Sequence, residues 1–145
     1  MARNVYSVCF LILFLKMWAT NFRQGLASTR AQSRTKEDYG LLMEKRDVSE
    51  EEKQDELRWK RQVLNDLENI PISLLIYLFS NYVSVQQHAH MCNIVTICIF
   101  TFSRIAFTIC YAYAWQPFRS IFYIIGQLCT LTAGITAVQQ AFKYS

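Results

Sequence analysis

Three groups of polar side chains lie within or beside apolar stretches of the sequence, and their residue types and spacing are suited to chemistry. In the first group, Arg61, Asn65 and Glu68 recur at helical intervals. This spacing puts a cation, an amide and a carboxylate on one face of a helix. A surface network of charged pairs at a membrane boundary is the simpler alternative. We favour a binding face for a charged ligand, because Asp66, Glu68 and Asn69 come directly before an apolar run.

The second group is centred on Arg104, with Thr108 and Tyr111 at helical spacing. Arg104 lies well inside an apolar segment, where the long side chain does not readily reach water from a helix end. Ionisable groups in such segments usually face the interior of a helix bundle and pair with another group. We therefore predict that a carboxylate on a neighbouring helix, Glu68 or Asp66, binds Arg104.

The third group follows Gln116 and Pro117, and it consists of Arg119, Ser120, Tyr123 and Gln127. It places a guanidinium at the start of an apolar segment and polar groups deeper inside it. Alone, Arg119 would be an anchor at the membrane interface. Arginine binds carboxylates through two parallel hydrogen bonds, and a carboxylate such as Glu68 attracts an ammonium group. A small peptide with two carboxylates and one amine, such as glutathione, matches these charges.

The composition and the apolar segments of the chain indicate which elements position these groups. Of 145 residues, 52% are hydrophobic and 18% are charged, which is too apolar for an ordinary soluble domain. All acidic residues lie between Glu37 and Glu68. This balance argues against a disordered chain and against a nucleic-acid-binding protein. The five cysteines are interpreted as packing thiols, and no metal site is expected.

Four segments predict transmembrane helices, at 4–22, 66–85, 91–115 and 117–141. They predict an all-α fold, with a single domain over 1–145 that forms an integral membrane four-helix bundle. Residues 23–61 are expected to form a cytosolic polar loop, whose second half is a helix that Ser49 caps and that runs into the second span. A cleavable signal peptide is the alternative for the first segment. Lys16 and Trp18 argue against it, because they stand where small cleavage-site residues are expected.

One set of motifs resembles a known family. Three motifs occur in order along the chain. The first is Arg61 with the string LNDLENI that begins at Leu64, the second is the Arg104 to Tyr111 spacing, and the third is the turn that leads to Arg119. In this arrangement the chain resembles the MAPEG family (membrane-associated proteins in eicosanoid and glutathione metabolism), most closely its microsomal glutathione S-transferase branch. The resemblance implies a homotrimer, with the co-substrate glutathione held between neighbouring subunits near the cytosolic face.

The resemblance also implies roles for individual residues. The glutathione contacts fall on Arg23, expected at the end of the first helix, and on Lys60, Arg61, Asn65, Glu68, Arg104 and Tyr111. The catalytic residues are expected to be Arg119, near the reacting sulfur, and Tyr111, as a hydrogen-bond donor. Two positions depart from the family pattern, since Lys60 stands in place of a second arginine and Val63 in place of a histidine. We expect these departures to weaken glutathione binding or to alter the activity.

The implied reaction conjugates the glutathione thiolate to hydrophobic electrophiles from the lipid, with glutathione peroxidase activity as an additional expectation. The implied location is the endoplasmic reticulum membrane, or also the mitochondrial outer membrane, with the active site facing the cytosol. Two alternatives stay open. Arg119, Ser120, Tyr123 and Gln127 also match the prostaglandin E synthase branch, which implies a glutathione-dependent isomerase. Lys60 and Val63 suit a non-catalytic membrane protein on the same scaffold.

Overall fold

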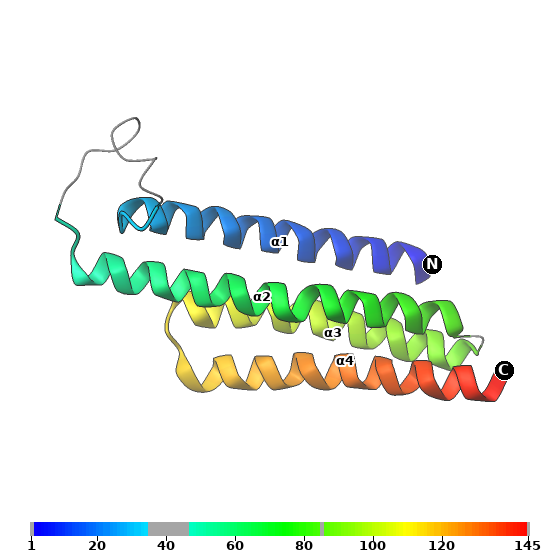
Figure 1. The fold of residues 1–145 in the computed structure, drawn as a ribbon. Helices are drawn as coiled ribbons and strands as arrows, with labels where there is room; N and C mark the ends of the chain where they lie inside the picture. Colours follow the sequence, from blue (N-terminus) through cyan, green and yellow to red (C-terminus); the bar gives the residue numbers. More distant parts are fainter. Residues whose placement is uncertain (1, 35–46, 85, 145) are drawn as a thin grey trace.

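The fold is an antiparallel bundle of four long helices (Figure 1). The computed structural model describes residues 2–34, 47–84 and 86–144. The helices are α1 (Ala2–Arg30), α2 (Glu50–Val83), α3 (Gln87–Ala112) and α4 (Gln116–Tyr144). Both chain ends lie at one end of the bundle, and the end of α1 and the start of α2 lie at the other. The helices α1 and α4 lie on opposite sides of the α2–α3 pair.

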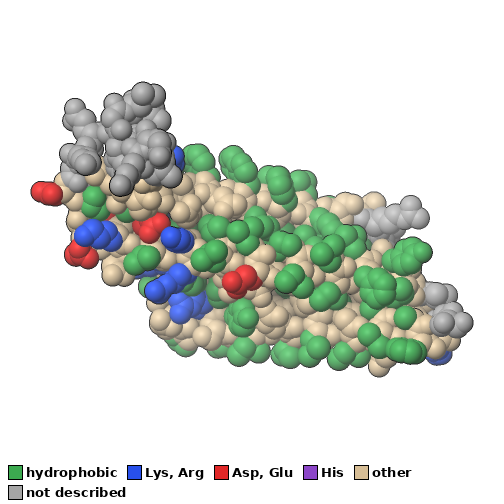
Figure 2. All heavy atoms as spheres, viewed as in Figure 1, with side chains coloured by type: hydrophobic (Ala, Val, Ile, Leu, Met, Phe, Trp, Pro, Cys, Tyr) green, Lys and Arg blue, Asp and Glu red, His purple; other side chains and the backbone are tan. Residues whose placement is uncertain are grey.

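Among the described residues, three helices are long and apolar enough to cross a membrane: Asn4–Arg30, Gln87–Ala112 and Gln116–Lys143. The helix α2 differs because its first half is charged and only its second half is apolar. Apolar side chains are spread along the visible face of the bundle, whereas most of the charged ones gather toward the end where α1 ends and α2 begins (Figure 2). An all-α bundle with an apolar exterior is suited to a lipid environment, as the sequence predicts.

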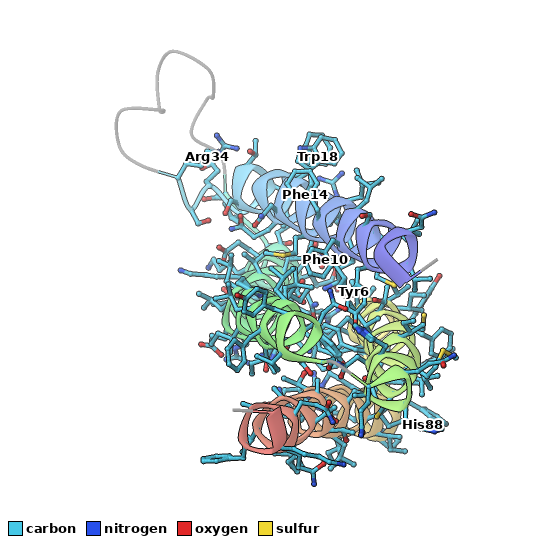
Figure 3. All side chains as sticks on the ribbon, turned by 90° about the vertical axis from the view of Figure 1, so that its right-hand side faces the viewer. Tyr6, Phe10, Phe14, Trp18, Arg34 and His88 are labelled. Carbon is cyan, nitrogen blue, oxygen red and sulfur yellow. The ribbon has the colours of Figure 1, made fainter. Side chains whose placement is uncertain are left out.

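The helix α1 runs further than the predicted first span, because its polar last turns pack on the start of α2. Ser28 donates a hydrogen bond to Glu56 (3.3 Å), and Glu56 is buried. On the outer side of α1, Trp18 points away from the other helices, whereas Tyr6 and Phe10 lie between α1 and the rest of the bundle (Figure 3). Much of the stretch expected as a polar loop is therefore helical, and its residues 35–46 lie outside the described residues.

The predicted start of α2 at Ser49 is confirmed. The Ser49 hydroxyl accepts a hydrogen bond from the Glu52 backbone N–H, and the Glu52 carboxylate accepts one from the Ser49 N–H, both at 3.2 Å. This capping box satisfies two backbone donors that the first turn of a helix leaves free. From there α2 continues without interruption into its apolar half, as expected.

The core combines apolar side chains with buried hydrogen bonds between helices. Its fully buried members include Leu13, Ile70, Tyr77 and Ile97. A close approach of α3 and α4 occurs at Gly126, where an added Cβ would lie 3.1 Å from the Ser103 hydroxyl. A small residue is needed there, which agrees with the use of small residues where membrane helices pack closely.

Candidate functional site

A buried ionic cluster joins α1, α2 and α3 in the middle of the bundle. Asp66 is 2% exposed and accepts a hydrogen bond from Arg104 at 2.7 Å. Its other carboxylate oxygen is bound by the ammonium group of Lys16. Gln62 donates to both oxygens at 3.2 Å, and also to the Thr108 hydroxyl at 3.0 Å. The cluster contains two cations and one anion, so its net charge is positive when all three groups are ionised.

Arg104 is the most completely enclosed charged residue of this cluster, at 1% exposed. Its Nη2 donates to Asn65 Oδ1 as well as to Asp66, both at 2.7 Å. Its guanidinium carbon lies 4.9 Å from the centre of the Phe107 ring. The predicted partner carboxylate is thus Asp66. Glu68 is exposed, because a shift of two positions along α2 turns the side chain from the bundle interior to the outside.

The outer face of α2 carries the other charged residues predicted for a ligand. Lys60, Arg61 and Glu68 are exposed, and Asn65 is half-buried at the edge of this face. The three-residue stripe expected from the spacing is therefore present. Asn65 is its link to the interior, because its carbonyl oxygen is bound by Arg104.

Asn69 and Gln127 tie α2 to α4 and are occupied by structural contacts. Asn69 donates to the backbone carbonyl of Asn65 at 2.7 Å and accepts a hydrogen bond from Gln127. One turn further along, the Thr130 hydroxyl donates to Ser73 at 2.9 Å. Both polar ends of Asn69 thus have partners in these contacts between α2 and α4.

Arg119 and Tyr111 meet at the end of the bundle where α3 and α4 connect. The Arg119 guanidinium carbon lies 4.6 Å from the centre of the Tyr111 ring, and its Nη2 donates to Gln116 at 3.0 Å. Phe107 contacts both Tyr111 (5.7 Å between ring centres) and Tyr123 (6.3 Å). A row of aromatic rings therefore connects buried Arg104 with half-buried Arg119. Ser120 is exposed beside it.

Arg23 lies inside α1, and the expectation that it ends the first helix is wrong, since α1 continues to Arg30. Its Nη2 is 3.3 Å from a carboxylate oxygen of Asp55, and its guanidinium lies over the Trp59 ring at 5.1 Å. Trp59 also donates to Asp55, at 3.2 Å. These contacts hold Arg23 against the charged half of α2.

The sequence interpretation missed Lys16 and Gln62 as members of the buried cluster. In the sequence, Lys16 argues only against cleavage of the first segment. The signal was nevertheless available, because a lysine inside an apolar helix needs a buried partner for the same reason as Arg104. Gln62 could have been found from its position one helical turn before Asp66.

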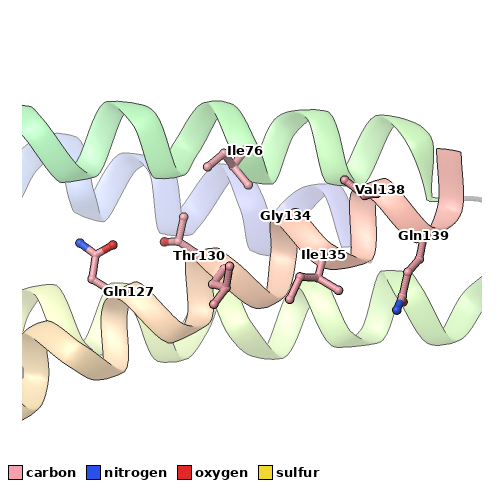
Figure 4. Close-up of a pocket in the computed structure, with 8 residues that line it drawn as sticks. Ile76, Gln127, Thr130, Gly134, Ile135, Val138 and Gln139 are labelled. Atoms are coloured by element: carbon pink, nitrogen blue, oxygen red, sulfur yellow. The ribbon is translucent and has the colours of Figure 1, made fainter. Parts of the chain in front are cut away.

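An apolar groove of about 580 Å³ lies between α2 and α4 (Figure 4). One of its lining residues, Gln127, donates a hydrogen bond to Asn69. The groove is lined by Ile76, Gln127, Thr130, Leu131, Gly134, Ile135, Val138 and Gln139. It offers a surface for an apolar molecule that reaches the bundle through the lipid. Within the described part of the chain, no group of histidine, cysteine and acidic side chains is arranged to hold a metal ion.

Two comparisons with known proteins complete this description. The sequence model of the MAPEG family matches residues 5–139. No curated protein matches the chain. The family match covers all four helices of the bundle, including every residue discussed above for the site.

Proposed function

Because this chain belongs to the MAPEG family, we propose that it is a glutathione transferase of the microsomal type. The family consists of multi-pass membrane proteins that form trimers and are generally glutathione-dependent enzymes or leukotriene-related proteins. The proposed reaction joins the sulfur of reduced glutathione to a hydrophobic electrophile. We place this reaction at the endoplasmic reticulum membrane, or also at the mitochondrial outer membrane, on the cytosolic side.

The observation that carries the proposal is the contact between Arg119 and Tyr111, 4.6 Å from guanidinium carbon to ring centre. A free thiol has a pKa of about 8.5, and the thiolate is the nucleophile. A cation beside the sulfur stabilises the thiolate and so lowers this pKa. In the proposed mechanism Arg119 supplies the charge, and the Tyr111 hydroxyl donates a hydrogen bond to the sulfur.

The outer face of α2 is proposed to bind the rest of glutathione. Arg61 and Lys60 would bind carboxylates, and Glu68 would bind the ammonium group. These side chains are exposed on a single subunit, which suits a ligand held between neighbouring subunits of a trimer. The electrophile would arrive from the lipid, along the apolar exterior of the bundle. The thiolate then attacks an electrophilic carbon, the new carbon–sulfur bond forms, and a leaving group such as halide departs.

The first test is a stopped-flow measurement of the ultraviolet thiolate absorbance when the purified protein is mixed with glutathione at neutral pH. We expect a saturable signal that decays when an aryl halide is added. Absence of the signal at millimolar glutathione would contradict the transferase proposal. It would favour a non-catalytic member of the family, for which Val63 and Lys60 are the sequence features.

A second candidate function is a glutathione-dependent isomerase that acts on a lipid endoperoxide. The observation in its favour is the exposed Ser120 directly beside Arg119, with Tyr123 one turn deeper. Gln127 fits this role less well, because it donates to Asn69. Product analysis separates the two functions, since a transferase releases a conjugate, whereas an isomerase releases a rearranged lipid and returns free glutathione.

A further inference from the structure

The buried cluster determines which end of the Asn65 amide is available to a ligand. Asn65 Oδ1 accepts the hydrogen bond from Arg104 at 2.7 Å. Its Nδ2 has no hydrogen-bond partner among the residues that the structure describes, and Asn65 is half-buried at the edge of the outer α2 face. Because the oxygen is held inward, the nitrogen is the group left for a ligand. Asn65 therefore offers a donor to a carboxylate or carbonyl oxygen.

Arg104 contacts Asn65 while Asp66 is shared with a second cation. One oxygen of Asp66 accepts from Arg104, and the other is bound by Lys16. A guanidinium prefers to bind both oxygens of a carboxylate with two parallel hydrogen bonds. Here Lys16 occupies the second oxygen, so a single nitrogen of Arg104 divides its contacts between Asp66 and Asn65.

We propose that Lys16 is a positioning residue for the glutathione site: by holding one oxygen of Asp66, it keeps Arg104 on the carbonyl oxygen of Asn65 and so directs the Asn65 amide nitrogen to the ligand. Lys16 does not touch the outer α2 face, since its side chain is 8% exposed within the bundle. It also leaves the cluster with one more cation than anion, which favours an anionic group of the ligand nearby. This inference rests on the proposed glutathione function.

Removal of Lys16 is expected to change the geometry of the cluster without leaving an unpaired charge. In Lys16→Met, Asp66 and Arg104 remain as a neutral pair, and Arg104 is free to take both carboxylate oxygens. Asn65 then loses the contact that fixes its amide, and either end of the amide can face the ligand. We expect glutathione affinity to fall about tenfold, the size of effect associated with one hydrogen bond to a charged group.

The test measures glutathione binding to the full-length protein by equilibrium dialysis with wild type, Lys16→Met, Asn65→Asp and the double variant. Asn65→Asp keeps an oxygen for Arg104 but replaces the outward donor with an acceptor, so we expect a loss of at least tenfold. If Lys16 acts through Asn65, the double variant binds no more weakly than Asn65→Asp alone. Losses that multiply in the double variant would overturn the proposal, because independent sites give additive free energies.

Two further variants distinguish positioning from general loosening of the bundle. Ser80→Ala also removes one buried hydrogen bond between helices, to Asn93, and we expect it to bind glutathione like wild type. Lys16→Arg restores a cationic donor to Asp66 and is expected to recover most of the affinity. If Lys16→Met does not yield folded protein, Lys16→Leu, which also has no donor for Asp66, takes its place in the same cycle.

The outcomes also separate this inference from the proposed function. If wild type binds no glutathione, the proposed function fails and the role of Lys16 fails with it. If wild type binds glutathione and Lys16→Met binds it equally well, the proposed function stands and the role of Lys16 is wrong. With saturating glutathione, turnover of Lys16→Met is expected to stay close to that of wild type, because Lys16 has no role at the sulfur.

Discussion

The guanidinium of Arg119 is half-buried and rests on an aromatic ring, so its charge is only partly screened by water. We predict that Arg119→Ala lowers conjugation at neutral pH about tenfold for each pKa unit by which the thiol returns toward its ordinary value. The rate should then rise with pH up to about 8.5, instead of levelling off at lower pH. The measurement is the pH dependence of turnover at saturating glutathione. A profile identical to that of wild type would show that Arg119 does not stabilise the thiolate.

Glu68 provides a prediction about glutathione binding that complements the prediction about the thiolate. It is exposed on the outer face of α2, and its proposed partner is the ammonium group of glutathione. Glu68→Gln should therefore raise KM for glutathione about tenfold while kcat changes little, because the lost contact is present in both the ground state and the transition state. Steady-state kinetics give both parameters. A fall in kcat at unchanged KM would assign Glu68 to the chemistry instead.

Arg104 illustrates which part of the buried cluster residue types and spacing could predict. An arginine inside an apolar segment requires a buried partner, and this requirement alone pointed to Asp66 or Glu68. The choice between them depends on the rotation of α2 in the bundle, which is set by the packing of Ile70 and Tyr77. Periodicity places residues on a common face, but it does not show which face meets α1 and α3. The pairing of Asp66 with Lys16 therefore could not be assigned from sequence.

At the scale of elements, the packing of α3 on α4 depends on Gly126 much more than on Gly134. A Cβ at Gly126 would lie 3.1 Å from Ser103, whereas one at Gly134 has only ordinary contact, 3.8 Å from Ile76. Gly126→Val should destabilise the protein by about 1–3 kcal/mol, the usual cost of overpacking a core. Gly134→Val, whose side chain enters the open groove between α2 and α4, should cost less. Thermal unfolding in detergent compares the two, and equal losses would contradict this packing.

Element boundaries were predicted well where a local motif specifies them. Ser49 and Glu52 form a capping box, which is a property of four consecutive residues. The end of α1 lacks such a motif. Its last turns are polar, and they stay helical through contacts with α2, such as Arg23 with Asp55 and Ser28 with Glu56. Contacts between segments distant in sequence are not contained in local propensity, so the predicted first span ended too early.

The two cations that share Asp66 make the stability of the bundle depend on this carboxylate. Asp66→Asn would leave Lys16 and Arg104 buried together without an anion, and we expect a loss of about 3–5 kcal/mol. The double variant with Lys16→Met has one cation fewer and should be more stable than Asp66→Asn alone. Thermal unfolding of Asp66→Asn, Lys16→Met and the double variant measures this order. If the double variant is the least stable, repulsion between the cations is not the cause.

In the proposed enzyme, the length of α2 relates to the two phases that supply glutathione and the hydrophobic electrophile. Its 34 residues span about 51 Å, whereas the hydrocarbon layer of a bilayer is about 30 Å thick. Because α2 is longer than this layer is thick, part of its charged half extends beyond the hydrocarbon, so in the proposed enzyme each reactant would be drawn from its own phase. For the proposed enzyme, the effective electrophile concentration is then its mole fraction in the bilayer. Protein-free vesicles added to an assay would dilute the electrophile and slow the reaction, although the volume of the solution and its glutathione content stay the same.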